Sequence, residues 1–172
     1  ETVRGLPESL LARAAEDAKH EGLDGWLFSL DFPTYDAVMR QADSRDLREA
    51  MYRGWVTRGS ELGKNPEWDN SENIERILSL RHEAANLVGF ANYAEYSLAT
   101  KMADTPAQVI GFLRELAAHS REAAERELAE LTEFAGMHLE AWDLTYWLEK
   151  FKQDRFSVSN EELRAYFPAA KV

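Results

Sequence analysis

The feature that most constrains the fold is one long amphipathic segment, residues 105–136, which reads TPAQVIGFLRELAAHSREAAERELAELTEFAG. Thr105 is a good N-cap, Pro106 fits a first helical turn, and Gly136 is a typical terminator. The residues that follow a three-four alternation are Val109, Phe112, Leu113, Leu116, Ser120, Ala123, Leu128, Leu131 and Phe134. A helix of ~30 residues would be ~45 Å long. That length predicts an antiparallel partner helix or the wall of a larger structure.

Helical signals continue through most of the remaining chain. The further helices expected from apolar spacing, capping residues and terminal glycines cover residues 8–22, 34–42, 44–62, 71–89, 92–98, 140–154 and 160–167, the last capped by Ser159. No repeating period is visible, which argues against a helical repeat array. The sequence therefore predicts an all-α fold.

One short segment departs from this pattern. GWLFSLDF, residues 25–32, is aromatic and is bounded by Gly25 and Pro33, and its spacing fits a strand over Trp26 to Leu30. No second strand is visible to pair with it. We expect at most this one strand, either as an unpaired edge or paired with a neighbouring molecule.

The composition excludes several classes of function. The 172 residues include 31 acidic and 20 basic side chains, for a net charge of −11, and no cluster of lysine or arginine. A nucleic-acid surface needs a basic patch, and an anionic membrane would repel this chain, so neither is expected as a partner. No apolar run is long enough to span a bilayer. Cysteine is absent, which removes disulfide and thiolate chemistry and is compatible with a cytoplasmic location.

A partial metal motif lies in LSLRHEAANLVGF, residues 78–90. In a zinc-peptidase helix H-E-x-x-H, two histidines four residues apart bind the metal and the glutamate activates a water. Here His82 and Glu83 are present, but Asn86 occupies the place of the second histidine. We interpret His82 as a helix-packing residue beside a surface glutamate, and expect no zinc at this position.

The other histidines do not provide a site either. None of the four is within helical reach of another, and the pairs Glu16–His20 and Glu115–His119 are typical of solvated helix faces. There is no glycine-rich phosphate loop and no G-x-S-x-G motif. The sequence therefore predicts no catalytic residue and no metal ligand within this chain.

Several blocks in one order give the chain a resemblance to a known family. The blocks are GWLFSLDFPTYDAVM, LREAMYRGWVTRGSE, WDNS, LRHEAANLVGFANYAEYSLATKMA, AWDLTYWLEK and FSVSNEELRAYFP. Together they resemble the thimet-oligopeptidase-like zinc metallopeptidases, and within that family its bacterial oligopeptidases. The resemblance covers nearly all of residues 1–172 and departs only near residues 136–140, where the link before AWD is short.

The resemblance implies a soluble, mostly helical enzyme with two lobes around a deep channel, of the neurolysin and thimet-oligopeptidase type. In such enzymes the H-E-x-x-H helix, the third zinc ligand and the residues that support the tetrahedral intermediate follow the matched region. The chain begins with Glu1 and contains none of those motifs. We therefore expect residues 1–172 to be a single helical segment, an internal fragment N-terminal to the zinc motif of its parent.

The resemblance implies a role as a non-catalytic wall of a cytoplasmic zinc oligopeptidase that hydrolyses short peptides, with the fragment itself inactive and binding no zinc. In WDLTYW, Asp143 could N-cap a helix whose Trp142, Tyr146 and Trp147 fill the core. Alternatively, Trp142, Asp143 and Tyr146 line the substrate channel. A different hypothesis is a stand-alone acidic helical interaction module. It would be favoured if the reading frame did not continue into H-E-x-x-H.

A fragment of this kind should expose apolar surface that the missing part covers. The places expected are the segment GWLFSL, the apolar stripe of residues 105–136, and the C-terminal LRAYF with Leu163, Tyr166 and Phe167. We expect possible self-association through these stripes, strengthened by salt because salt screens the repulsion between acidic chains.

Overall fold

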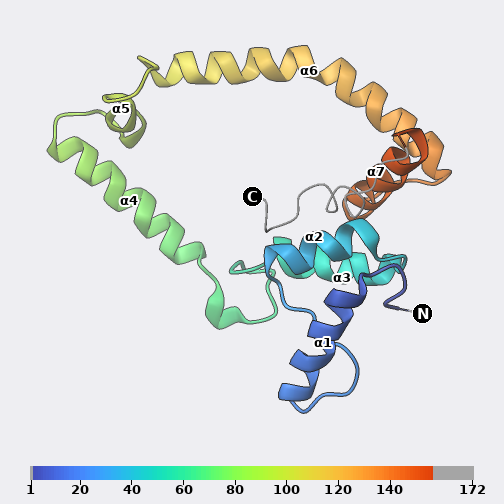
Figure 1. Cartoon of the computed structure of the whole chain (residues 1–172). Helices are drawn as coiled ribbons and strands as arrows, with labels where there is room; N and C mark the ends of the chain where they lie inside the picture. The colour runs from blue at the N-terminus through green and yellow to red at the C-terminus, as the bar shows by residue number, and fades with distance from the viewer. Residues whose placement is uncertain (1, 157–172) are drawn as a thin grey trace, which may run out of the picture. The chain divides into compact units, whose positions relative to one another are not determined.

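The computed structural model describes residues 2–156. Figure 1 shows its helices, which are α1 (Glu8–His20), α2 (Phe32–Gln41), α3 (Arg45–Val56), the 3-10 turn η1 (Pro66–Trp68), α4 (Ser71–Leu87), α5 (Tyr93–Leu98), α6 (Pro106–Ala135) and α7 (Ala141–Phe156). Within this described part there is no β-strand. The all-α fold predicted from the sequence is confirmed. The expected helix at 160–167 lies outside the described residues.

The capping signals placed most helices correctly. The Asn92 side chain accepts a hydrogen bond from the Glu95 amide at 3.0 Å and so caps α5. The Thr105 hydroxyl likewise accepts from the Gln108 amide at 3.2 Å at the start of α6. Gly136 follows α6 with a φ of +66°, a left-handed conformation that favours glycine. Both ends of the 30-residue helix are therefore where the sequence predicted them.

Helix α3 is shorter than the sequence predicted. It ends at Val56, not at Leu62. Beyond it the chain turns: the Ser60 hydroxyl donates to the Thr57 carbonyl at 2.9 Å, and Gly59 has a φ of +63°. The Gly59 carbonyl then accepts from the Asn70 amide at 2.9 Å, which closes the loop. Hydrogen bonds of the turn and of the Ser60 side chain replace helical hydrogen bonds here. The apolar spacing of the sequence therefore did not predict that α3 ends at Val56.

The prediction of a strand at Trp26–Leu30 is wrong, because the structure of residues 2–156 contains no strand there. The segment is extended, but the Leu27 amide donates to the Ala14 carbonyl of α1 at 2.9 Å, so it bonds to a helix and not to a second strand. Phe28 and Leu30 pack against the core formed by the neighbouring helices. The aromatic and apolar spacing therefore reflects side chains that pack onto helices, and no second strand is present to form a ladder.

The chain divides into two compact units. Unit 1 comprises residues 1–56 and 129–172, and unit 2 comprises residues 57–128. Helix α6 contributes its first part to unit 2 and its last residues to unit 1.

Unit 1 contains a continuous apolar core. Helix α2 packs against both α3 and α7, and α3 also packs against α7. The buried core residues are Leu6, Leu10, Val38, Met39, Ala42 and Met51. At the end of α6, the Phe134 ring meets Trp147 and Phe151 of α7 edge-on, with centroids 6.2 and 5.2 Å apart. Packing on several sides therefore fixes α7 within this unit.

Unit 2 lacks a comparable core. Within residues 57–128, Ala85 is the only buried residue. Helices α4 and α5 pack together near that residue, where the Phe90 and Tyr96 rings lie 5.4 Å apart. Large apolar side chains on α4 are exposed, namely Ile74, Ile77, Leu78, Leu80 and Leu87. The amphipathic pattern of α4 is therefore real, but most of its apolar surface is uncovered.

Candidate functional site

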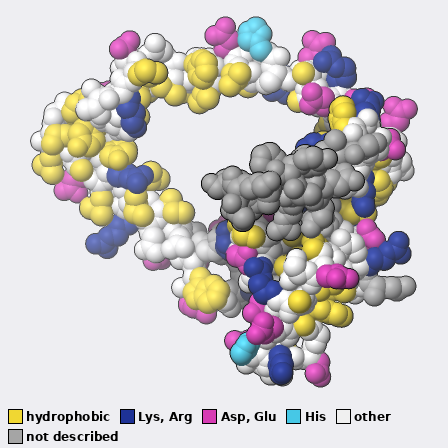
Figure 2. Space-filling view, in the orientation of Figure 1, with side chains coloured by type: hydrophobic (Ala, Val, Ile, Leu, Met, Phe, Trp, Pro, Cys, Tyr) yellow, Lys and Arg dark blue, Asp and Glu magenta, His cyan; other side chains and the backbone are white. Residues whose placement is uncertain are grey.

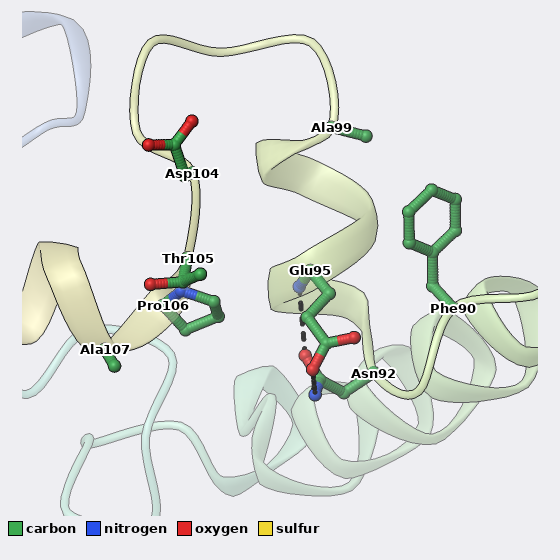
Figure 3. Close-up of a pocket in the computed structure, with 8 residues that line it drawn as sticks. All are labelled: Phe90, Asn92, Glu95, Ala99, Asp104, Thr105, Pro106 and Ala107. Atoms are coloured by element: carbon green, nitrogen blue, oxygen red, sulfur yellow. Dashed lines mark hydrogen bonds between the residues drawn. The ribbon is translucent and has the colours of Figure 1, made fainter.

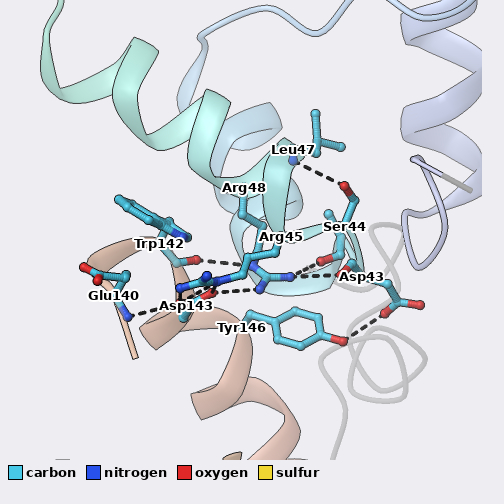
Figure 4. Close-up of polar contacts among 10 residues, drawn as sticks. Asp43, Ser44, Arg45, Leu47, Arg48, Glu140, Trp142, Asp143 and Tyr146 are labelled. Carbon is cyan, nitrogen blue, oxygen red and sulfur yellow. Dashed lines mark hydrogen bonds and ion pairs between the residues drawn. The ribbon is translucent and has the colours of Figure 1, made fainter. Parts of the chain in front are cut away.

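The densest polar arrangement in unit 1 joins the start of α3 to the start of α7 (Figure 4). Arg45 and Arg48 are three residues apart and share one face of α3, while Asp143 and Tyr146 share one face of α7. Asp43, just before α3, completes the group. We call these five residues the arginine–aspartate cluster.

The Asp143 carboxylate is the centre of the cluster and has no exposed surface. Arg45 contacts it through Nη2 at 2.7 Å and Nε at 3.1 Å. Arg48 Nη2 donates to Oδ1 at 2.9 Å, and the Glu140 amide donates to Oδ2 at 3.1 Å. Both carboxylate oxygens are thus engaged by several donors, which is what a buried charge requires.

Arg48 is nearly as buried, with 3% of its surface exposed. Its Nη1 donates to the carbonyls of Ala42 at 2.7 Å and Asp43 at 3.3 Å, and its Nε donates to the Trp142 carbonyl at 3.3 Å. The guanidinium also lies 4.2 Å from the centre of the Tyr146 ring. One arginine therefore ties the end of α2, the start of α3 and the start of α7 together.

The electrostatics of the cluster favour fixed charges. Burial raises the pKa of Asp143, but hydrogen bonds from Arg45, the Glu140 amide and Arg48 outweigh it and leave the pKa below its ordinary value. Burial, together with the hydrogen bond to Asp43, raises the pKa of Tyr146. Asp143 is therefore ionised and Tyr146 protonated at neutral pH. Neither is poised to exchange a proton, so the cluster acts as a brace.

The structure brings together the three residues that the sequence singled out. The N-cap position predicted for Asp143 is wrong, because α7 begins at Ala141 and Asp143 lies within its first turn. Its carboxylate instead accepts from the backbone amide of Glu140, the residue just before the helix, as the third residue of a capping box does. Trp142 and Tyr146 are half-buried. The Trp142 ring lies 6.0 Å from the ring of Tyr52, and the Tyr146 hydroxyl donates to Asp43 at 2.9 Å. That they line a substrate channel stays a prediction.

Sequence reasoning missed the partners of Asp143. Arg45 and Arg48 lie 98 and 95 residues away in the chain, so no local pattern connects them to Asp143. The available signal was weak. It consisted of two arginines at helical spacing near the start of the helix predicted at residues 44–62, and of one aspartate within an aromatic block that was expected to be buried. An aspartate placed in a core requires a buried cation, but the sequence did not identify which one.

The partial zinc motif is exposed on α4. The side chains of His82 and Glu83 both face solvent in this chain, so the interpretation of His82 as a packing residue is wrong. The Asn86 amide donates to the His82 carbonyl at 3.0 Å, within the helix. The pairs Glu16–His20 and Glu115–His119 lie on solvated faces, as predicted. Within residues 2–156 no group of three His, Cys, Asp or Glu could hold a metal.

Unit 2 contains one open pocket of about 650 Å³ between α5 and the start of α6 (Figure 3). It is lined by Phe90, Asn92, Glu95, Ala99, Asp104, Thr105, Pro106 and Ala107. The Asn92 amide is committed to Glu95, with which it exchanges two hydrogen bonds of 3.0 Å. The pocket offers two carboxylates, apolar surface and the Thr105 hydroxyl, which already caps α6, and no histidine lines it.

Comparisons with known proteins connect this helical chain to peptidases. Residues 38–172 match Peptidase family M3. The chain is 50% identical to oligopeptidase A of Escherichia coli (strain K12), over 99% of this chain and 26% of that protein. It is 38% identical to a probable cytosolic oligopeptidase A of Arabidopsis thaliana, again over 99% of this chain and 26% of the relative. Dipeptidyl carboxypeptidase of E. coli is 32% identical over 96% of this chain and 25% of its own length.

The chain spans about a quarter of the length of these relatives. The resemblance drawn from the sequence blocks, including that to bacterial oligopeptidase A, is confirmed. In addition, no helix in the described part of the chain is long and apolar enough to cross a membrane. The family match covers most of the chain, and the chain therefore belongs to peptidase family M3.

Proposed function

We propose that this chain is a helical, non-catalytic wall region of a zinc-dependent oligopeptidase that hydrolyses short peptides. The observation that carries the proposal is the match over 99% of the chain to proteins named oligopeptidase A, of which it spans 26%. In this proposal residues 1–172 form one helical segment that precedes the zinc motif of the whole protein. The substrates are peptides, and the location is the cytoplasm.

The described residues do not fit a catalytic zinc ion. A catalytic zinc needs three protein ligands and an open coordination position, and residues 2–156 offer no such group. We therefore assign zinc and the residues that activate water to parts of the protein outside this chain. No chemical step is assigned to the side chains described above.

The contribution of this chain is rigidity. A wall that limits access by substrate size must keep its shape, and the arginine–aspartate cluster fixes α7 against α3. The ion pair between Arg40 of α2 and Glu149 of α7, at 3.4 Å, adds a second polar link between helices. Asp143 supports the wall from inside. Trp142 and Tyr146 keep some exposed surface and are our candidates for lining the channel.

The test compares the full-length protein with residues 1–172, using a quenched fluorescent peptide as substrate. We expect the full-length protein to cleave the peptide, a chelator to stop the cleavage, and added zinc to restore it. Residues 1–172 alone should show no turnover, with or without zinc. Turnover that persists when residues 1–172 are repurified would contradict the assignment.

The same experiment separates the alternative function. If the full-length protein also failed to cleave a panel of short peptides with zinc present, the interaction-module hypothesis would be favoured. Cleavage by the full-length protein that resists a chelator would support the assignment as a peptidase but contradict its dependence on zinc. In either case the helical structure of this chain would be unaffected, because it does not depend on the reaction.

A further inference from the structure

One face of α6 is apolar and uncovered along the part of the helix that belongs to unit 2. Its residues are Val109, Phe112, Leu113, Leu116, Ser120 and Ala123, which are spaced three or four apart and so share a side. We call this face the α6 stripe. Phe112, Leu113 and Leu116 are 63, 55 and 54% exposed. In Figure 2 the apolar side chains of α6 gather along one side of the helix, away from most of its charges.

The stripe is suited to close packing. Its larger side chains stand at one end, and Ser120 and Ala123 are small, so that another helix could approach the backbone closely there. Ser120 is the polar residue of the stripe, and its hydroxyl donates to the Leu116 carbonyl at 2.9 Å. Because that hydrogen bond lies within the helix, covering the stripe would leave no unsatisfied hydroxyl.

The opposite side of α6 is built for solvent. The ion pairs Arg121–Glu125 and Arg126–Glu122, each at 4.0 Å, run along the helix and are largely exposed. Helix α6 is also absent from the helix pairs that pack extensively within the described residues, which are α2–α3, α2–α7, α3–α7 and α4–α5. One side of α6 thus has the charged surface expected toward water, while no other helix of residues 2–156 packs extensively against the apolar side.

We propose that the α6 stripe is an intramolecular docking surface, covered in the whole protein by an apolar helical surface from the part of the polypeptide outside this chain. The inference rests on one part of the proposed function, namely that the whole protein is a peptidase of family M3 that is longer than this chain. The oligopeptidase A relatives are about four times the length of this chain, since it spans 26% of them. A large amount of the same polypeptide is therefore expected next to this surface.

Charge argues against a second copy of this chain as the occupant in the whole protein. Each copy carries a net charge of −11, so two copies brought together would repel each other. A segment of the same polypeptide is already tethered at high effective concentration, and it need not be acidic. Tethering therefore favours the intramolecular partner.

The test measures how accessible the stripe is in the full-length protein. Leu113→Cys places a thiol on the stripe, and Ala118→Cys places one on the opposite side of the same helix, five residues away. Native cysteines outside this chain are first replaced by serine, and maleimide labelling is followed by mass spectrometry. We expect the thiol at 113 to react at least about tenfold more slowly than the thiol at 118, and equally fast once the protein is denatured.

Three outcomes would overturn the proposal. The first is equal labelling of the two sites in the native full-length protein. The second is slow labelling at 113 that disappears on dilution, which would indicate a second copy. The third is full protection at 113 in residues 1–172 alone at low concentration, which would place the cover inside this chain. All three are read without peptidase activity, so they are independent of the test of the proposed function.

If Leu113→Cys impaired folding, hydrogen exchange of the unaltered full-length protein would decide the same question. Residues 109–123 should then exchange slowly, as buried helices do. Helix α2, which is covered on two sides in unit 1, is the internal reference for a protected helix. Exchange in α6 as fast as in an isolated helix would contradict the proposal.

Discussion

The two units are built from similar amphipathic helices but differ in what covers those helices. Unit 1 buries six core hydrophobic residues and a charged cluster whose carboxylate has no exposed surface. Unit 2 buries only Ala85 and leaves isoleucine and leucine side chains of α4 about half exposed. The same kind of sequence pattern therefore yields a core only where a partner helix is present. A helix pattern predicts which side will be covered but not by what.

The largest expected difference between the units concerns the buried charge of unit 1. Asp143→Ala should destabilise the chain by about 3–5 kcal/mol, because it leaves Arg48 buried without its carboxylate. Urea unfolding followed by circular dichroism measures this. The matched control is Glu49→Ala, which breaks the exposed i,i+4 pair with Arg53 and should cost about 0.3–0.5 kcal/mol. Equal losses would mean that the cluster is not a brace.

The second prediction compares apolar side chains. Met39 is 2% exposed in the core of unit 1, and Met39→Ala should cost about 2–5 kcal/mol. Leu78 of α4 is 59% exposed, and Leu78→Ala in residues 1–172 should change stability by no more than about 0.5 kcal/mol. The free energy of unfolding from urea curves checks both. A large loss from Leu78→Ala would show that unit 2 has a core in solution.

Local sequence signals predicted what is decided locally. Asn92, Thr105 and Gly136 act within one helical turn, and each was placed correctly. The strand expected at residues 26–30 failed because side-chain packing onto helices produces the same apolar spacing as a strand. The end of α3 was missed because turn hydrogen bonds near Ser60 compete with the helix.

The candidate site shows the same division between local and long-range information. The aromatic block identified Trp142, Asp143 and Tyr146 as residues of interest, and the structure places all three together. The identity of the buried cations could not be predicted, because Arg45 and Arg48 reach Asp143 across nearly 100 residues of chain. Ion pairs of that separation depend on the tertiary fold, which no capping rule or periodicity encodes.

The third prediction concerns pH and the start of α2. Hydrogen bonds to the Asp31 carboxylate from the Ser29 hydroxyl and from the amide and hydroxyl of Thr34 lower its pKa to about 2. Since the folded pKa lies below the unfolded value of 3.8, this stabilisation is present above about pH 4 and is lost as the pH falls toward 2. Asp31→Ala should cost about 1 kcal/mol at pH 7.

At pH 2 that cost should shrink, because the Asp31 carboxyl is then about half protonated in the folded state and almost wholly protonated in the unfolded state, so most of this stabilisation is lost. Urea unfolding of both proteins between pH 2 and pH 7 measures the difference. Asp31→Asn is the control, since asparagine keeps a capping oxygen without the charge. A loss from Asp31→Ala that did not depend on pH would mean that the cap stabilises α2 without its ionisation.

The smallest expected effect is association of the isolated chain through its exposed apolar surface. Without the rest of the protein, the α6 stripe and the exposed Trp26 and Leu27 offer apolar surface to other copies; the third predicted place, Leu163, Tyr166 and Phe167, lies outside the described residues. The net charge of −11 opposes contact, so association of residues 1–172 should be weak at low salt and stronger when salt screens the repulsion. Sedimentation velocity over a range of concentration and salt measures it.

Leu116→Glu should weaken the association, whereas Ala118→Glu, which adds the same charge on the opposite side of α6, should leave most of it. If the two variants associated equally, net charge alone would govern the association. The apolar surface that unit 2 exposes would then have no effect in solution.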